Sequence, residues 1–128
     1  MTAADERLVV FVPGHPRNPL NGSWGGWLKH ARQAKRWREA TALAVYVALG
    51  RARARVRDPA VPKRITFTVR TWNPWDDDAL PAVVKPCRDA LVEAGVLHGD
   101  GLQHGHVFRY RQRVDRSRRG IDILVERA

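Results

Sequence analysis

The order of hydrophobic patterns along the chain constrains its fold more than any other feature. Short segments at residues 8–12, 63–71, 106–114 and 121–125 are apolar throughout or alternate between apolar and polar residues, which predicts strands. Apolar residues recur every three or four positions over residues 27–49 and 80–94, which predicts helices. We therefore expect an α+β fold with a mixed β-sheet and two helices, in the order β-α-β-α-β-β. The last two strands are expected to pair as a hairpin, and 128 residues fit a single domain over 1–128.

The first expected helix has a basic first half and an apolar second half. Its apolar stripe consists of Leu28, Ala31, Ala34, Trp37, Ala40, Ala44 and Val47. Residues 40–49 are apolar except for Thr41 and the hydroxyl group of Tyr46. We therefore expect the second half to be the more buried one, and Gly50 to stop the helix.

The second expected helix contains a proline and is followed by a glycine. Its apolar stripe consists of Val84, Cys87, Leu91 and Ala94. The stripe makes Cys87, the only cysteine of the chain, a core residue. Pro86 either starts this helix or kinks it, and Gly95 is expected to cap its C-terminus.

An acidic cluster precedes this helix. Six of the 13 acidic residues lie between Asp76 and Asp100, in a chain of formal net charge +10. If the segment is extended, Asp76 and Asp78 point to one side and Asp77 to the other. Two carboxylates on one side are suitable ligands for a hard cation such as Mg²⁺. The alternative for this segment is a solvated turn.

Residues after the cluster complete the expected reaction centre. Lys85 and Asp89 are four positions apart on one helix face, where they form either part of the centre or a simple ion pair. Asp100 follows the helix and is expected to fold back toward the cluster. Mg²⁺ activates water and polarises phosphoryl oxygens, and a lysine stabilises charge that grows on a phosphate. These residues therefore predict phosphodiester hydrolysis.

The charge predicts a polyanionic partner. A net charge of +10 favours nucleic acid, because basic groups release counterions from phosphates; an anionic membrane surface is the alternative. The expected DNA-binding residues are Lys29, Arg32, Lys35 and Arg36 on the first helix and Arg109, Arg111 and Arg113 on one face of the third strand. The other face of that strand, with Phe108, Tyr110 and Val114, is expected to face the core.

Other residue types narrow the function further. Trp24, Trp27, Trp72 and Trp75 flank the loops, and we expect core packing for each rather than stacking on a base. The three histidines at positions 98, 104 and 106 lack the cysteines of a structural zinc site. No apolar run approaches the ~20 residues of a membrane span, and residues 1–6 lack the features of a signal peptide. We expect a soluble, cytoplasmic protein without a membrane partner.

Several short motifs resemble the RusA family of Holliday-junction resolvases. They are Asp76-Asp77-Asp78-Ala79-Leu80, Lys85-Pro86-Cys87-Arg88-Asp89-Ala90-Leu91, Glu93-Ala94-Gly95-Val96 and Gly99-Asp100. The family pattern is Asp-x-Asp-Asn, a lysine, Asp-Ala-Leu, Ala-Gly and a terminal Asp-Asp pair. The similarity is close within residues 76–100 and loose over most of the chain.

The resemblance implies a role for each matching residue. The metal ligands of the family match Asp76, Asp78 and Asp100. Its catalytic residues match these three aspartates and Lys85, and a supporting residue matches Asp89. It also implies Mg²⁺ or Mn²⁺ as the cofactor and branched DNA as the substrate. It further implies a homodimer that places two sites on opposite strands of a four-way junction and makes paired nicks. The expected location is the cytoplasm of a bacterium or a phage-infected host cell.

The chain departs from the family pattern at three points, of which the first two motivate an alternative. Ala79 replaces the usual asparagine, Gly99 replaces the first aspartate of the terminal pair, and the spacing from Asp78 to Lys85 exceeds that of the shortest family members. The alternative is a branched-DNA-binding protein that is catalytically weakened or inactive. A third hypothesis, an RNA-binding accessory protein, rests on the charge alone.

Overall fold

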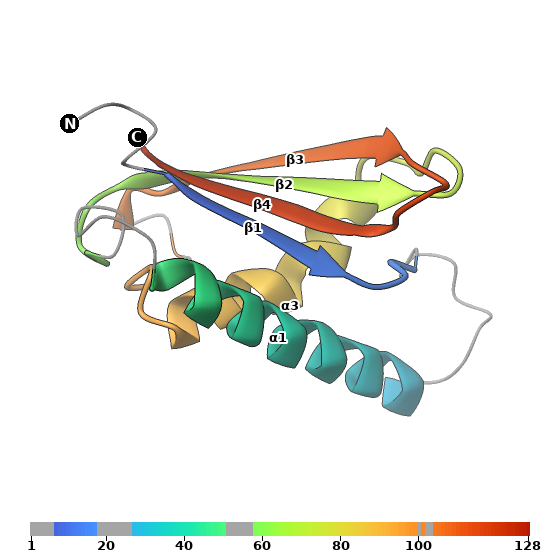
Figure 1. The fold of residues 1–128 in the computed structure, drawn as a ribbon, viewed down its shortest axis with the longest axis horizontal. Coiled ribbons are helices and arrows are strands. Elements are labelled where there is room, and N and C mark those ends of the chain that lie inside the picture. Colours follow the sequence, from blue (N-terminus) through green and yellow to red (C-terminus); the bar gives the residue numbers. More distant parts are fainter. Residues whose placement is uncertain (1–6, 18–26, 51–57, 100, 102–103) are drawn as a thin grey trace.

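The computed structural model of the protein describes residues 7–17, 27–50, 58–99, 101 and 104–128 (Figure 1). Its elements are β1 (Leu8–Pro13), α1 (Trp27–Leu49), β2 (Lys63–Thr71), α3 (Ala79–Glu93), β3 (Val107–Val114) and β4 (Gly120–Arg127). The expected α+β class and the order β-α-β-α-β-β are confirmed. Within the described ranges, neither helix has the length and apolar character needed to cross a lipid bilayer.

The four strands form one mixed sheet in the order β1-β4-β2-β3. β4 runs antiparallel to β1 and β2, whereas β3 runs parallel to β2. The expected hairpin between the last two strands is wrong, because β2 lies between them. The segment 115–119 instead crosses the end of β2, where the N–H of Asp115 donates to the carbonyl oxygen of Thr71 at 3.0 Å. β4 and β2, the two central strands, each have a neighbour on both edges.

Both helices cover the same face of the sheet, and no described helix covers the opposite face (Figure 1). Ile65, Phe67 and Val69 alternate along β2 and are buried under the helices, as expected. α1 packs against β1 and α3, and α3 also contacts β3. The molecule therefore has a helix layer on one side and an open sheet face on the other.

α1 buries a narrower side than its sequence predicts. Trp37, Thr41 and Val45 are buried. Its exposed large apolar side chains are Leu28, Leu43, Tyr46 and Val47. The expected burial of the second half is therefore wrong for one side of the helix. The cause is position: α1 lies at the β1 edge of the sheet, so only the side toward β1 and α3 is covered.

α3 begins at Ala79 and continues through Pro86. The predicted stripe residues Val84, Cys87 and Leu91 are all buried. The Sγ atom of Cys87 accepts a hydrogen bond from the Thr41 hydroxyl at 3.3 Å, which ties α3 to α1. Burial raises the pKa of the Cys87 thiol to about 11.

Gly95 ends α3, as the sequence predicts. Its φ of 77° lies in the left-handed region that favours glycine. The N–H of Val96 donates to the carbonyl oxygen of Leu91, and the N–H of Gly95 donates to that of Val92, both at 3.0 Å. These two bonds form a Schellman motif and direct the chain away from the helix axis.

Candidate functional site

An acidic turn, formed by Asp76, Asp77 and Asp78, joins β2 to α3. Asp78 is the N-cap of α3 and has helical dihedral angles, φ −69° and ψ −14°. The N–H groups of Ala79 and Leu80 donate to the carbonyl oxygens of Asp76 and Asp77 at 3.1 and 3.2 Å. The segment is therefore a helical turn rather than an extended strand end. Strand alternation consequently does not place Asp76 and Asp78 on one side.

Gln112 on β3 anchors this turn. Its side-chain amide group donates to the carbonyl oxygen of Trp75 at 2.7 Å and to Asp77 Oδ1 at 3.0 Å. Its oxygen accepts from the N–H of Trp75 at 2.8 Å. Asp77 is thus held toward β3, contrary to the expectation that it points away. In the described part of the chain, no hydrogen bond or ion pair engages the carboxylates of Asp76 and Asp78, which are exposed.

One side of α3 carries the remaining predicted residues that the structure describes. Asp78, Lys85 and Asp89 are separated by seven and four positions, so they fall along a single stripe of the helix. Lys85 Nζ lies 3.5 Å from Asp89 Oδ1, with the two side chains 64% and 40% exposed. The expected ion pair is therefore present, and its exposure makes it weak. Lys85 is free to exchange this partner for another anion at little cost.

A groove of about 280 Å³ runs beside this stripe, between α1 and α3. Lys85, Pro86 and Asp89 line it on the α3 side, and Ala34 and Arg38 line it on the α1 side. A neighbouring hollow of about 230 Å³ shares three of these lining positions, Ala34, Ala82 and Pro86, and adds His30 and Gln33 of α1. Cationic and polar groups from two elements therefore converge beside the middle of α3, over the positions from Ala82 to Asp89.

Asp100 lies outside the described residues, and its role as a metal ligand stays a prediction. Its neighbour Gly99 packs closely against His104. A Cβ atom at position 99, which glycine lacks, would lie 2.7 Å from His104 Nε2. His104 stacks on His106, which accepts a hydrogen bond from the N–H of Lys63, the first residue of β2. The acidic turn lies beyond the other end of β2, where Asp76 follows Thr71 after four intervening residues. α3, whose 15 residues span about 22 Å, runs between these two ends.

His106 is buried and carries an unsatisfied group. Its Nδ1 accepts the N–H of Lys63 at 3.0 Å, whereas its Nε2 has no partner among the described residues. Burial, followed by the charges of Lys63, His104 and His98, lowers the pKa of His106 below 6.5. Burial therefore disfavours the charged form of this imidazole in the folded protein.

The two predicted DNA-binding surfaces lie on opposite sides of the molecule. One surface, on α1, contains Lys29, Arg32, Lys35 and Arg36, all of them exposed. The other, on β3, contains Arg109, Arg111 and Arg113, also exposed, on the open face of the sheet. Phe108 and Tyr110 point inward against Phe67, as expected. Val114 is 46% exposed, contrary to expectation, because it is the last residue of an edge strand.

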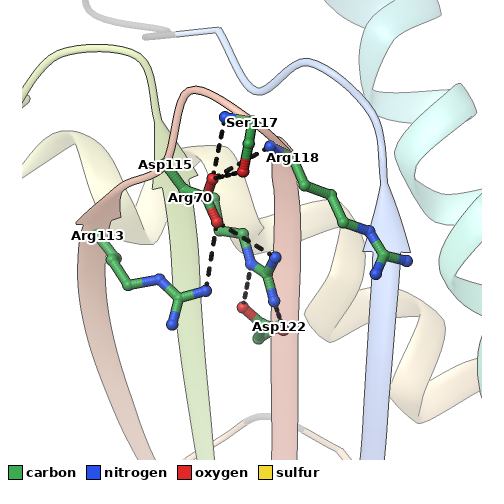
Figure 2. Close-up of polar contacts among 6 residues, drawn as sticks. All are labelled: Arg70, Arg113, Asp115, Ser117, Arg118 and Asp122. Carbon is green, nitrogen blue, oxygen red and sulfur yellow. Dashed lines mark hydrogen bonds and ion pairs between the residues drawn. The ribbon is translucent and has the colours of Figure 1, made fainter.

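Figure 2 shows a polar network where the segment 115–119 crosses the end of β2. Arg70 donates to the two carboxylate oxygens of Asp122 at 2.7 and 2.9 Å and lies 3.5 Å from Asp115. Arg113 also lies 3.5 Å from Asp115. The hydrogen bond from Arg70 to Asp122 raises the pKa of the guanidinium group further. The network fixes the ends of β2 and β4, and sequence reasoning missed it because the partners are far apart in the chain.

Asp115 also organises the crossing segment itself. It accepts the Ser117 hydroxyl at 2.7 Å and the N–H groups of Ser117 and Arg118 at 3.1 Å (Figure 2). The Ser117 hydroxyl, followed by the N–H of Arg118, lowers the pKa of the Asp115 carboxyl group. An aspartate followed two residues later by a serine was the available sequence signal for this turn.

Arginines of the same segment, together with Arg70 of β2, lie over two aromatic rings. The guanidinium carbons of Arg70 and Arg118 are 4.4 and 4.2 Å from the ring centre of Phe11. Arg116 and Arg119 lie 5.3 Å from that of Trp72. Trp72 is 49% exposed, so its expected burial in the core is wrong. The end of β2 therefore presents a basic and aromatic surface four residues before the acidic turn.

The chain was compared with known protein families and with curated protein sequences, and neither comparison finds a match.

Proposed function

We propose that this chain is a metal-dependent endonuclease that acts on branched DNA, with its reaction centre at the acidic turn and the first half of α3. One observation carries the proposal. Asp78, Lys85 and Asp89 form one exposed stripe on α3, beside a groove whose α1 wall carries Arg38. Carboxylates on one stripe with Lys85, which lines this groove, suit a phosphodiester, which needs both a metal and positive charge around it.

Two of the three proposed ligands lie in the described part of the structure, and their carboxylates are the donor type that suits a hard divalent cation. Within that part, no group of three or more His, Cys, Asp or Glu side chains is placed to hold a metal ion. Asp76 and Asp78 offer exposed carboxylates that no other described residue occupies, and carboxylate oxygen is the preferred ligand of Mg²⁺ and Mn²⁺. Asp100 is the third proposed ligand. A bound cation supplies Lewis acidity toward the phosphate ester.

The protein's own side chains position the substrate. Lys85 can leave Asp89 and neutralise a phosphate seated in the groove, because their exposed ion pair is weak. Asp89 holds the Lys85 ammonium group beside the groove until the phosphate arrives. Gln112 fixes the acidic turn through Trp75 and Asp77, and so sets the position of the two remaining aspartates.

The partners follow from the charge. The basic residues of α1 and β3 bind the DNA backbone, and a homodimer would bring two reaction centres to one junction for paired nicks. The proposal implies action in the cytoplasm of a bacterium or a phage-infected host cell.

Cleavage of a synthetic four-way junction with Mg²⁺ tests the proposal. The wild-type protein is expected to nick the junction, whereas Asp78→Asn and Lys85→Ala lose most of this activity. Asp58→Asn, the same change at an exposed aspartate outside the proposed centre, is the matched control and should cut normally. Equal cutting by Asp78→Asn and Asp58→Asn would contradict the assigned centre.

The second candidate is a branched-DNA-binding protein with weak or no catalysis. The described neighbours of Asp100 favour it, since they lie at the far end of α3 from the acidic turn. Ala79 and Gly99 replace polar residues of the family pattern and favour it too. It predicts salt-sensitive junction binding without cleavage in Mg²⁺ or Mn²⁺, so cutting in either metal excludes it.

A further inference from the structure

Trp72, the first residue after β2, is a large aromatic side chain that the fold leaves at the surface. It is 49% exposed, and its neighbours Asn73 and Arg116 are exposed too. A single exposed aromatic side chain is common on protein surfaces. The surroundings of this ring therefore decide whether it binds a ligand.

The segment 115–119 holds the backbone at Trp72 in place. Arg116 donates from Nε to the carbonyl oxygen of Trp72 and from Nη2 to Asn73 Oδ1, both at 3.2 Å. Asp115 fixes the start of the segment by accepting the hydroxyl and the N–H of Ser117 (Figure 2). The ring therefore stands on a fixed backbone, which reduces the ordering cost when a ligand stacks on it.

Two arginines lie beside the ring. The guanidinium carbons of Arg116 and Arg119 are each 5.3 Å from the ring centre of Trp72. Cation–π contacts at an exposed site are weak, so a guanidinium group can leave the ring for a stronger partner. Phosphate is such a partner, because the planar fork of arginine binds it through two parallel hydrogen bonds.

The other arginine-bound ring, that of Phe11, is occupied by the fold itself. Arg70 and Arg118 lie 4.4 and 4.2 Å from its centre. Gly120 packs so closely against it that a Cβ atom there would lie 2.7 Å from the ring. Phe11 therefore supports the crossing segment, whereas Trp72 offers a ring that a ligand can reach.

We propose that Trp72, Arg116 and Arg119 form a stacking site for one unpaired nucleotide, with the base on the indole ring and the arginines on the adjoining phosphates. The proposed function enters only through the source of this nucleotide, which is the branch point of the DNA substrate. Trp72 precedes Asp76 by four residues, so their Cα atoms are at most about 14 Å apart. A strand held at Trp72 therefore passes the acidic turn within a few nucleotides.

A protein partner suits this surface less well than a nucleotide chain. Tryptophan and arginine also anchor protein interfaces, but there they sit in well-packed, fully desolvated pockets. The crossing segment beside Trp72 is polar and cationic instead: residues 116–119 contain three arginines and no acidic residue. Stacked bases need only an accessible ring face and positive charge along the backbone, and this surface provides both.

Binding of short single strands by the full chain, measured without divalent metal, tests the site. Oligothymidylate is compared with an abasic strand of equal length, which keeps the phosphates and lacks the bases. The wild-type protein is expected to bind oligothymidylate roughly tenfold more tightly. Trp72→Ala should remove this difference, whereas Tyr46→Ala, at an exposed aromatic residue of α1, should keep it. An unchanged difference in Trp72→Ala would overturn the proposal.

The salt dependence of the same binding tests the arginines. Arg116→Gln and Arg119→Gln should each lower the slope of log affinity against log salt by about 0.7 for both strands, because each removes a phosphate contact. Trp72→Ala should keep the wild-type slope, since stacking releases no counterions. Wild-type slopes in both arginine variants would overturn the assigned phosphate contacts.

Photocross-linking tests the source of the nucleotide. Iodouracil at the branch point of a four-way junction should cross-link to Trp72, and iodouracil paired within an arm should not. Equal cross-linking at both positions would overturn the selection of an unpaired base, and tighter binding of oligouridylate than of oligothymidylate would overturn DNA as the source. A protein that stacks thymine on Trp72 without ever cutting the junction would reject the proposed function and leave this site intact. Junction cutting by a protein that binds thymidylate and abasic strands equally would do the opposite.

Discussion

The three consecutive aspartates of the acidic turn differ in what holds their carboxylates. Asp77 is bound by Gln112, whereas Asp76 and Asp78 have no side-chain partner among the described residues. Repulsion among adjacent carboxylates is relieved when a cation binds, so the two unengaged groups are the ones expected to bind it.

Terbium luminescence tests this difference without any substrate. Tb³⁺ is a hard cation that takes oxygen ligands, and an indole close to it sensitises its emission; Trp75 directly precedes the turn. We expect Asp76→Asn and Asp78→Asn each to weaken Tb³⁺ binding by roughly tenfold, and Asp77→Asn to weaken it much less. If Asp77→Asn lost as much affinity as the other two, the assignment of ligands would be wrong.

His106 predicts a second effect, on stability. The pKa of His106 is lower in the folded protein than the usual 6.5. As the pH falls below 6.5, the imidazole is therefore protonated more readily in the unfolded chain than in the folded protein. The contribution of His106 to stability is therefore complete above pH about 6.5 and decreases as the pH falls toward its folded pKa.

Denaturant unfolding between about pH 7.5 and 5.5 measures this effect. The wild-type protein is expected to lose stability as the pH falls, and His106→Asn is expected to show a shallower loss. His15→Asn, at an exposed histidine, is the control and should keep the wild-type slope. A His106→Asn slope equal to that of wild type would show that the buried imidazole is not the source.

At the scale of elements, the two glycines that follow α1 and α3 allow a matched test of helix ending. Gly95 has φ of 77°, and a Cβ atom there would meet nothing within 4 Å. Gly95→Ala should therefore cost about 1 kcal/mol from backbone strain alone. Gly50 follows α1 without a positive φ, so Gly50→Ala should be neutral or slightly stabilising. Thermal unfolding of both variants compares them, and equal losses would mean that backbone strain at Gly95 is not the cause.

Local patterns predicted the elements but not how they are arranged. Alternation identified β2 and the inward face of β3, and three-to-four spacing identified both helices. The hairpin prediction failed because a five-residue segment between strands is compatible with either a hairpin or a crossing. The deciding contacts, from Arg70 to Asp115 and Asp122, join residues too far apart to be seen in a local window. The exposed side of α1 was missed for a similar reason, since a position at the sheet edge is a property of the assembled fold.

The candidate site was predictable in residue type more than in geometry. The helix-face relation of Lys85 and Asp89 follows from spacing, and the structure contains that pair. The helical conformation of the acidic turn depends on Asp78 serving as the N-cap of α3, which an extended segment excludes. The role of Gln112 left no signal in the sequence, because it joins two segments 35 or more positions apart.

At the scale of the whole molecule, the basic residues of α1 and β3 are separated by the body of the protein. The first set belongs to the helix layer and the second to the open sheet face (Figure 1). DNA is stiff on this length scale, with a persistence length of about 150 base pairs, so a straight duplex that lies on one side does not reach the other. A branched molecule, whose arms leave in different directions, is not limited in this way.

This separation predicts different salt dependences for linear and branched DNA. Removing one phosphate-binding side chain should lower the slope of log affinity against log salt by about 0.9 on duplex DNA. For a four-way junction, replacing Arg109, Arg111 and Arg113 by glutamine should reduce the slope, and so should replacing the four basic residues of α1. For a linear duplex, only one of the two replacements should reduce the slope.

Arg7→Gln with Arg64→Gln is the control, because both arginines already pair with Glu126. If both replacements reduced the slope equally on linear and branched DNA, the two surfaces would not distinguish DNA shapes, and the preference for branches would have to arise at the acidic turn and the adjoining groove.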